Sequence, residues 1–375
     1  MTTAHKRPFF VAFTQPYLPT YRVPLFDALQ QELAQQEGSF RVYAGTPHGD
    51  QAGRDDEADA SWQRPMRSRS LRLGDRKIEM RSLPDGAATA DVLVTELAVG
   101  NLLAWRRLIG RKPTVLWGHG AAYVTKPSKL GDLHKVCMVR LASHTMTYTE
   151  GGRAHLIMRR APARKISAIG NSTDSEILRQ GIVEFRSRAT RNAGTSALFI
   201  GGLDASKRID FLLDAARHAR ELEPTFTLVI VGRGPLEDVV RQAADERGGI
   251  RLISQARGRD LAELAASADM IWMPGRVGLV AVDAIALGLP VHTVRHGLHA
   301  PEIEMLRRGE VEYLPNSPGS FARESLKRAG QLPLRDDYPT VQRVAHRMAE
   351  VIAVVAHADA DAADPRMKKR VSNHV

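Results

Sequence analysis

The feature that most constrains the fold is an alternation of short apolar segments with longer segments whose apolar residues recur at helical spacing. The short segments predict buried strands and the longer ones predict helices. The alternation runs twice, once before residue 181 and once after residue 195. Strands that alternate with helices form parallel sheets, because each helix carries the chain back across its sheet. We therefore predict an α/β protein with two parallel sheets.

The first run predicts strands at residues 7–14, 40–44, 91–94, 114–117 and 144–147, with a helix at residues 23–35. The second run predicts strands at residues 197–200, 227–231, 250–253 and 270–273. Its helices are expected at residues 208–222, 236–247, 259–268 and 278–287.

A chain of 375 residues is too long for one ordinary core, so its length also favours two domains. Residues 181–195 are polar and without period, as expected of a linker. We predict four parts: an N-terminal domain at residues 1–185, a C-terminal domain at 196–340, a final helix at 341–356 that packs back on the N-terminal domain, and a disordered tail at 357–375. Residues 49–85, which change from acidic to basic, are expected to be mobile.

Charge and cysteine content narrow the function classes. The formal net charge of +11 favours anionic partners, although arginine-rich proteomes also produce basic enzymes without one. No nucleic-acid-binding motif is recognised, so nucleic acid is not an expected partner. Cys137 is the only cysteine, which excludes an internal disulfide and thiolate zinc sites.

Two basic segments with apolar residues, 101–112 and 126–140, predict docking on an anionic membrane surface. The alternative is that each helix packs on the core and turns a solvated cationic face outward. No export signal is recognised and no apolar run approaches the roughly 20 residues needed to span a bilayer. We expect a cytoplasmic protein, peripheral on the inner face of the cytoplasmic membrane.

The strongest local signal is the segment 273–290, in which a strand ends, a glycine-containing turn follows and a helix begins near Gly278. Free N–H groups at a helix start suit a diphosphate, and glycine lets a ligand approach the backbone. Asp283 is placed about a turn and a half into the helix, where ribose hydroxyls would lie. The same turn also occurs in α/β proteins that bind no phosphate.

The segment resembles the nucleotide-sugar site of glycosyltransferase family 4, whose members have the GT-B fold of two facing Rossmann-like domains. Residues 275–279 read Gly-Arg-Val-Gly-Leu, and after Asp283 residues 284–291 read Ala-Ile-Ala-Leu-Gly-Leu-Pro-Val. Matching segments cover residues 197–304; they include residues 199–203 with Lys207, residues 231–236 and residues 301–303. Weaker matches in the N-terminal half lie at residues 116–120, 148–152 and 169–174.

The resemblance implies catalytic roles for His119, Lys207 and Glu302. It implies that the diphosphate and sugar of the donor are bound by Lys207, Arg208, Arg233, Gly278, Leu279 and Asp283. Arg22, in the first strand-to-helix loop, and Asn171 are candidates for contact with the cleft or the acceptor. Outside this context, a histidine after a strand is usually structural.

The implied reaction needs no metal and no cofactor. Negative charge develops on the leaving nucleoside diphosphate, and fixed cations with helix-start N–H groups can stabilise it directly. The resemblance implies transfer of a hexose with retention of anomeric configuration, from a nucleoside-diphosphate sugar to a glycan or lipid-linked acceptor. A narrower likeness points to bacterial cell-surface polysaccharide biosynthesis. Nucleotide base, donor sugar, acceptor, linkage and oligomeric state are left open.

Three positions depart from the family pattern. Gly275 replaces the first glutamate, Asp283 the second, and Gly202 the arginine beside the diphosphate, for which Arg208, Arg233 or Arg276 are candidate substitutes. The departures keep a non-catalytic GT-B scaffold as one alternative. Another GT-B enzyme, such as a sugar-nucleotide 2-epimerase or an inverting transferase, is a second.

Overall fold

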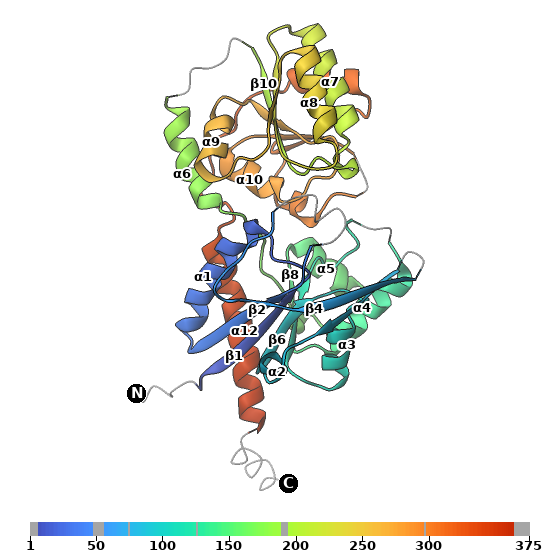
Figure 1. Cartoon of the computed structure of the whole chain (residues 1–375), viewed down its shortest axis with the longest axis vertical. Helices are drawn as coiled ribbons and strands as arrows, with labels where there is room; N and C mark the ends of the chain where they lie inside the picture. Colours follow the sequence, from blue (N-terminus) through green and yellow to red (C-terminus); the bar gives the residue numbers. More distant parts are fainter. Residues whose placement is uncertain are drawn as a thin grey trace.

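The protein is described by a computed structural model over residues 7–47, 56–73, 76–124, 127–188, 194–295 and 298–363. Within these residues the chain forms two parallel sheets, which lie one above the other in Figure 1. Each sheet has its own hydrophobic core. The α/β class and the two parallel sheets are as predicted.

The first sheet has the strand order β3-β2-β1-β6-β7-β8-β9, and all its pairings are parallel. Its strands are β1 (Phe9–Gln15), β2 (Gly38–Ala44), β3 (Gln63–Pro65), β6 (Val92–Glu96), β7 (Thr114–Gly118), β8 (His144–Thr147) and β9 (Ile166–Ala168). The accompanying helices are η1 (Thr20–Arg22), α1 (Val23–Ala34), α2 (Asp85–Ala88), α3 (Leu102–Ile109), α4 (Lys129–Leu141), α5 (Glu150–Met158) and η3 (Ala163–Lys165).

The second sheet has the order β12-β11-β10-β13-β14-β15 and is also parallel throughout. Its strands are β10 (Ser196–Ile200), β11 (Thr227–Val231), β12 (Ile250–Ile253), β13 (Met270–Trp272), β14 (Val291–Val294) and β15 (Val311–Leu314). Its helices are α6 (Ser175–Arg186), η4 (Ala205–Lys207), α7 (Ile209–Leu222), α8 (Glu237–Arg247), α9 (Gly258–Ala266), α10 (Val280–Leu287), η5 (Pro301–Met305) and α11 (Pro318–Leu326).

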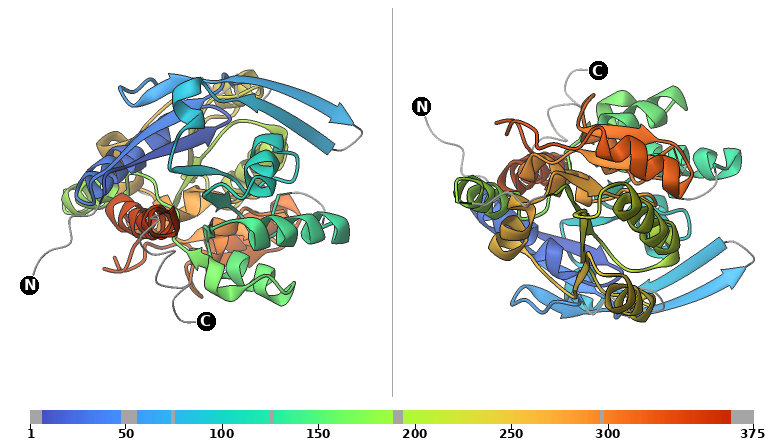
Figure 2. Two further views of the ribbon diagram at one scale, coloured as in Figure 1. Left: turned by 90° about the horizontal axis from the view of Figure 1, so that it is seen from below. Right: turned by 90° about the horizontal axis from the view of Figure 1, so that it is seen from above.

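The segment 49–85, which we expected to be mobile, is largely structured where it is described. Strands β4 (Arg67–Leu73) and β5 (Arg76–Ser82) form an antiparallel hairpin that projects from the first domain in Figure 2. Arg81 anchors the hairpin, because its buried guanidinium forms ion pairs with Glu96 and Glu79. Residues 49–55 and 74–75 of this segment lie outside the described residues.

The chain crosses between the sheets earlier than the sequence analysis placed the domain boundary. Helix α6 extends to Arg186, into the first part of the predicted linker at 181–195, and its Leu178 and Ile182 are buried in the core of the second sheet. Because α6 packs with that sheet, the crossing lies at residues 169–174. The polar sequence after residue 186 marks the end of α6 and not the crossing.

The final helix, α12 (Val341–Ala363), returns to the first domain and packs against α1 (Figure 1). It continues past the predicted end at residue 356, because the alanine-rich sequence after His357 favours helix. The part of the predicted tail after residue 363 lies outside the described residues. No described helix is both long and apolar enough to cross a membrane.

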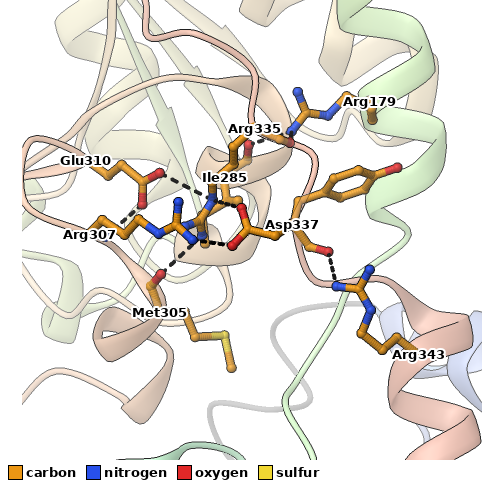
Figure 3. A network of polar contacts seen from close by, with 9 residues as sticks. Arg179, Ile285, Met305, Arg307, Glu310, Arg335, Asp337 and Arg343 are labelled. Atoms are coloured by element: carbon orange, nitrogen blue, oxygen red, sulfur yellow. Dashed lines mark hydrogen bonds and ion pairs between the residues drawn. The ribbon is translucent and has the colours of Figure 1, made fainter.

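A network of polar contacts fixes the segment that leads into α12 (Figure 3). The guanidinium of Arg179 donates to the backbone oxygen of Arg335 at 2.8 Å and lies 4.5 Å from the centre of the Tyr338 ring. Asp337 forms an ion pair with Arg307. The return of the chain from the second domain to the first is therefore held by side chains of the second domain.

Candidate active site

A cavity of about 630 Å³ lies where loops at the carboxyl ends of both parallel sheets meet. From the first domain it is lined by Thr20, Tyr21, Val23, Pro24 and Asp56. From the second it is lined mainly by the loops that follow β10, β11, β12 and β13 and by the start of α10. We call this space the interdomain cavity. Loops at the carboxyl ends of parallel strands are the usual ligand site of open α/β sheets.

The second domain supplies the cationic side chains of the cavity, which are Lys207, Arg233, Arg257 and Arg276. Lys207 ends the short helix η4, and its Nζ donates a hydrogen bond to the backbone oxygen of Arg276 at 2.6 Å. This bond ties the loop after β10 to the loop after β13. Fixed cations of this kind suit an anionic ligand such as a diphosphate.

Glycines allow the loops that line the cavity to approach one another closely. A side-chain carbon on Gly232 would lie 1.9 Å from the backbone oxygen of Gly201, and one on Gly275 would lie 2.4 Å from that of Ser206. Both contacts are with backbone, so neither can relax by turning a side chain. Position 275 therefore has no room for the glutamate that the family pattern carries there.

Helix α10 runs from Val280 to Leu287, two residues later than predicted at its start, and all its residues are buried. Its one carboxylate, Asp283, accepts a hydrogen bond of 2.7 Å from Oγ1 of Thr173 and lines the cavity. Burial raises the pKa of Asp283 to about 6, and the bond from Thr173 partly offsets this effect. The carboxylate thus sits where α10 meets the crossing between the domains.

The raised pKa of Asp283 predicts a pH dependence of stability. Between the ordinary pKa of an aspartate and about 6, the folded protein holds a proton that the unfolded chain has released. The free energy of unfolding should therefore fall by about 1.4 kcal/mol for each pH unit in this window, and no further above it. We expect Asp283→Asn, which keeps an oxygen for Thr173, to remove this decline. Urea unfolding between pH 4 and 7 measures this fall in stability. Identical pH profiles for the wild type and Asp283→Asn would contradict the assignment of the fall to Asp283.

A buried polar chain joins the two domains beside the cavity. Nη1 of Arg22 donates to Oδ1 of Asn171 at 3.1 Å, and Nδ2 of Asn171 donates to Oε1 of Glu302 at 2.6 Å. All three side chains are buried. The guanidinium of Arg22 lies 4.6 Å from the centre of the Trp117 ring. Arg22 is thus held in the domain junction, and Glu302 is already hydrogen-bonded there.

His119 follows β7 and lies in the same junction, with its ring centre 5.4 Å from that of Tyr148. Burial first, and then the positive charges of Lys135 and Arg22, lower the pKa of His119 to about 4. The charge of Arg276 acts in the same direction, so His119 is within electrostatic reach of the second domain. Its imidazole is neutral at neutral pH and suits hydrogen bonding to a sugar hydroxyl.

The predicted site residues fall into three groups. Those that line the interdomain cavity are Lys207, Arg233, Leu279 and Asp283. Those in the adjoining domain junction are Arg22, His119, Asn171 and Glu302. The remaining two, Arg208 and Gly278, do not line the cavity.

Arg208 does not face the cavity, and its backbone is in the left-handed region, with φ at 55°. Its guanidinium lies over the ring of Phe211 and donates to Oδ1 of Asn316 at 2.7 Å. We therefore leave Arg208 out of the proposed site. Sequence reasoning missed Arg257 and Asp56 as lining residues, since neither stands in a recognisable motif.

Comparison with known proteins finds a family that matches the second domain. Residues 194–328 match the family described as "Glycosyl transferases group 1". A phosphatidyl-myo-inositol mannosyltransferase of Mycobacterium leprae is 35% identical over 134 residues, which are 34% of this chain and 35% of that protein. The match thus spans about a third of the relative's length. The predicted resemblance is confirmed for this part of the chain, which is similar to group 1 glycosyltransferases.

Solved structures match nearly the whole chain. A UDP-GlcNAc 2-epimerase from Neisseria meningitidis bound to UDP-GlcNAc has a TM-score of 0.58 at 12% identity, with 92% of this chain and 99% of that chain covered. Anabaena HepE in complex with UDP-glucose has a TM-score of 0.52 at 14% identity, with 97% and 100% covered. At such low identity these likenesses show the fold alone, and they confirm the predicted GT-B fold.

Proposed function

We propose, starting from the group 1 glycosyltransferase domain at residues 194–328, that the protein transfers a hexose from a nucleoside-diphosphate sugar to a glycan or lipid-linked acceptor. One observation carries the proposal: Lys207, Arg233 and Arg276 line a cavity that loops of both domains enclose. A donor held there by the second domain would present its sugar to the first. We further propose that the reaction retains anomeric configuration, needs no metal and serves bacterial polysaccharide biosynthesis.

The cations of the second domain would stabilise the leaving group. As the bond to the anomeric carbon breaks, negative charge grows on the diphosphate, and Lys207 and Arg233, which line the cavity, would compensate it. Leu279 and Val280, at the start of α10, also line the cavity. Their backbone N–H groups and the helix dipole favour an anion at this point.

The two junction residues His119 and Glu302 would act on the sugar without carrying a proton. The lowered pKa of His119 leaves its imidazole neutral, so it suits a hydrogen bond to a sugar hydroxyl. Glu302 is engaged by Asn171, so we assign it the role of aligning the junction and contacting the sugar when the donor binds.

Hydrogen exchange with added nucleoside diphosphate tests where the donor binds. We expect UDP, GDP or ADP to protect the loops around Lys207, Arg233 and Leu279, because these residues line the cavity and a bound ligand would steady their loops. Calorimetric titration with the same nucleotides gives the affinity. Protection confined to other segments, or no binding of UDP, GDP or ADP, would contradict a donor site in this cavity.

The scaffold alternative rests on Gly202 and Gly275, which stand where the family pattern has charged donor contacts. At Gly275 the packing also leaves no room for a carboxylate. A scaffold without catalysis predicts that a nucleoside diphosphate binds while no sugar nucleotide is turned over. Binding and turnover together favour the transferase.

We also propose that the first domain docks on an anionic membrane, where a lipid-linked acceptor would be available. Exposed apolar side chains lie on two neighbouring helices, Leu102 and Ile109 on α3 and Leu130 and Leu133 on α4. Exposed basic residues, among them Arg106, Lys129 and Arg140, lie on the same helices. Apolar side chains beside cations suit insertion among acidic headgroups.

Replacing both Leu130 and Leu133 with Ser should weaken binding to vesicles that contain anionic lipid by about tenfold, because each side chain loses apolar area to bury. Sedimentation with anionic and neutral vesicles measures the effect. The matched control is Leu222→Ser, an exposed leucine on α7 of the second domain, which should bind as the wild type does. Equal binding of the wild type to both kinds of vesicle would contradict electrostatic docking.

A further inference from the structure

The segment at residues 56–58 is fixed against the first strand-to-helix loop. The backbone N–H and the Oγ1 of Thr20 both donate to the backbone oxygen of Asp56, at 2.7 and 2.6 Å. The N–H of Ala58 donates to the oxygen of Leu18 at 2.9 Å. These bonds pair the segment antiparallel with the loop and bring Asp56 to the wall of the interdomain cavity.

One carboxylate oxygen of Asp56, Oδ1, is buried without a hydrogen-bond partner among the described residues. Burying a carboxylate oxygen without a hydrogen-bond partner costs free energy, so such an atom is usually hydrogen-bonded to protein, water or ligand. Because Asp56 lines the interdomain cavity, rotation about its χ2 would turn a carboxylate oxygen toward a donor group that enters the cavity.

The position of Asp56 distinguishes the two substrates. It belongs to the first domain, whereas Lys207, Arg233 and Arg276, which suit a diphosphate, belong to the second. A carboxylate repels phosphate, so its ligand must be an uncharged or cationic group that can donate a hydrogen bond. A sugar or polyol hydroxyl has this chemistry, and both the donor sugar and the acceptor carry such groups.

We propose that Asp56 binds the hydroxyl of the acceptor that receives the sugar, and orients its oxygen toward the anomeric carbon. This inference rests on the proposed transferase function. The acceptor group beside Asp56 is then a sugar or polyol hydroxyl. Any phosphate of the acceptor would lie away from Asp56. The residue lies in a segment that no family motif marks.

Hydrolysis of the sugar nucleotide tests this role without a known acceptor, because water then takes the place of the acceptor hydroxyl. We expect Asp56→Asn to lower the kcat of hydrolysis about tenfold, as expected for loss of a charge-assisted hydrogen bond. The KM for the sugar nucleotide and the Kd for the nucleoside diphosphate should stay unchanged. The control is Glu57→Gln, which removes the same charge from the adjacent exposed residue and should leave all three constants unchanged.

Each other outcome overturns the inference in a recognisable way. A raised KM with unchanged kcat would assign Asp56 to the donor sugar. Unchanged constants in Asp56→Asn, and also in Asp56→Ala, would remove it from the site. A wild type that turns over no sugar nucleotide would refute the transferase function itself, and the inference would fall with it. Unchanged nucleotide binding shows that the variants are folded, since the segment is held by backbone atoms of Asp56.

Discussion

Replacing Lys207 with Ala is expected to lower kcat/KM for the sugar nucleotide roughly 100- to 1,000-fold, the range found when one fixed donor to a developing anion is removed. Lys207 combines a position on the cavity wall with a 2.6 Å bond to the backbone of Arg276. Loss of the Lys207 side chain therefore removes one cation from the cavity and loosens the loop that carries a second cation, Arg276. Steady-state release of nucleoside diphosphate measures the effect.

Arg208→Asn is the matched control for Lys207→Ala. It removes the adjacent positive charge, and asparagine tolerates the left-handed backbone that Arg208 adopts. Because the Arg208 side chain lies against Phe211 and Asn316, away from the cavity, activity should stay within about twofold of the wild type. A large loss in Arg208→Asn together with a small one in Lys207→Ala would contradict the assigned diphosphate site.

The second large effect is expected from Gly275→Ala. The added carbon would lie 2.4 Å from the oxygen of Ser206 and 2.5 Å from the Cα of Lys207, so one of two backbone segments must move. We expect the free energy of unfolding to fall by about 1 to 3 kcal/mol, as for an overpacked core. Activity should fall as well, because the displaced backbone carries Lys207. Urea unfolding and turnover measure the two effects.

Gly278→Ala tests the same turn without a clash. A side-chain carbon on Gly278 would meet only Ala300, at an ordinary 3.8 Å. Stability should therefore stay within about 0.5 kcal/mol of the wild type. If Gly275→Ala were as stable and as active as Gly278→Ala, the close approach of the two loops would not be a property of the folded protein.

Periodicity predicted the fold well because buried parallel strands and amphipathic helices leave strong patterns in sequence. The second sheet shows this best: the strands Thr227–Val231 and Ile250–Ile253 have the predicted bounds, and Ser196–Ile200 and Met270–Trp272 each differ from theirs by one residue. Composition was a weaker guide to the boundary between the domains. The polar stretch at 181–195 reads as a linker, yet α6 extends into it, because Leu178 and Ile182, four residues apart on one face of the helix, dock it on the second core.

The site could be predicted where residues stand in ordered motifs and not where the fold brings distant residues together. Lys207, Arg233 and Asp283 follow strands of one sheet, so order along the chain places them in one cavity. Asp56 lies in a segment without periodicity, and the backbone pairing of this segment with Leu18 and Thr20 brings it to the cavity. The side chain of Arg208 lies against Phe211 and Asn316, and neither these contacts nor its positive φ angle can be read from the sequence.

The reaction itself is the most direct test of the account. Purified protein is incubated with UDP-, GDP- and ADP-sugars, the release of nucleoside diphosphate is followed, and the configuration of the new anomeric centre is read by proton NMR before mutarotation. We predict turnover of one nucleotide class, with retained configuration and with the activity lost in Lys207→Ala. Absence of turnover with every sugar nucleotide would contradict the transferase, and an epimerised or inverted product would contradict the reaction proposed for this cavity.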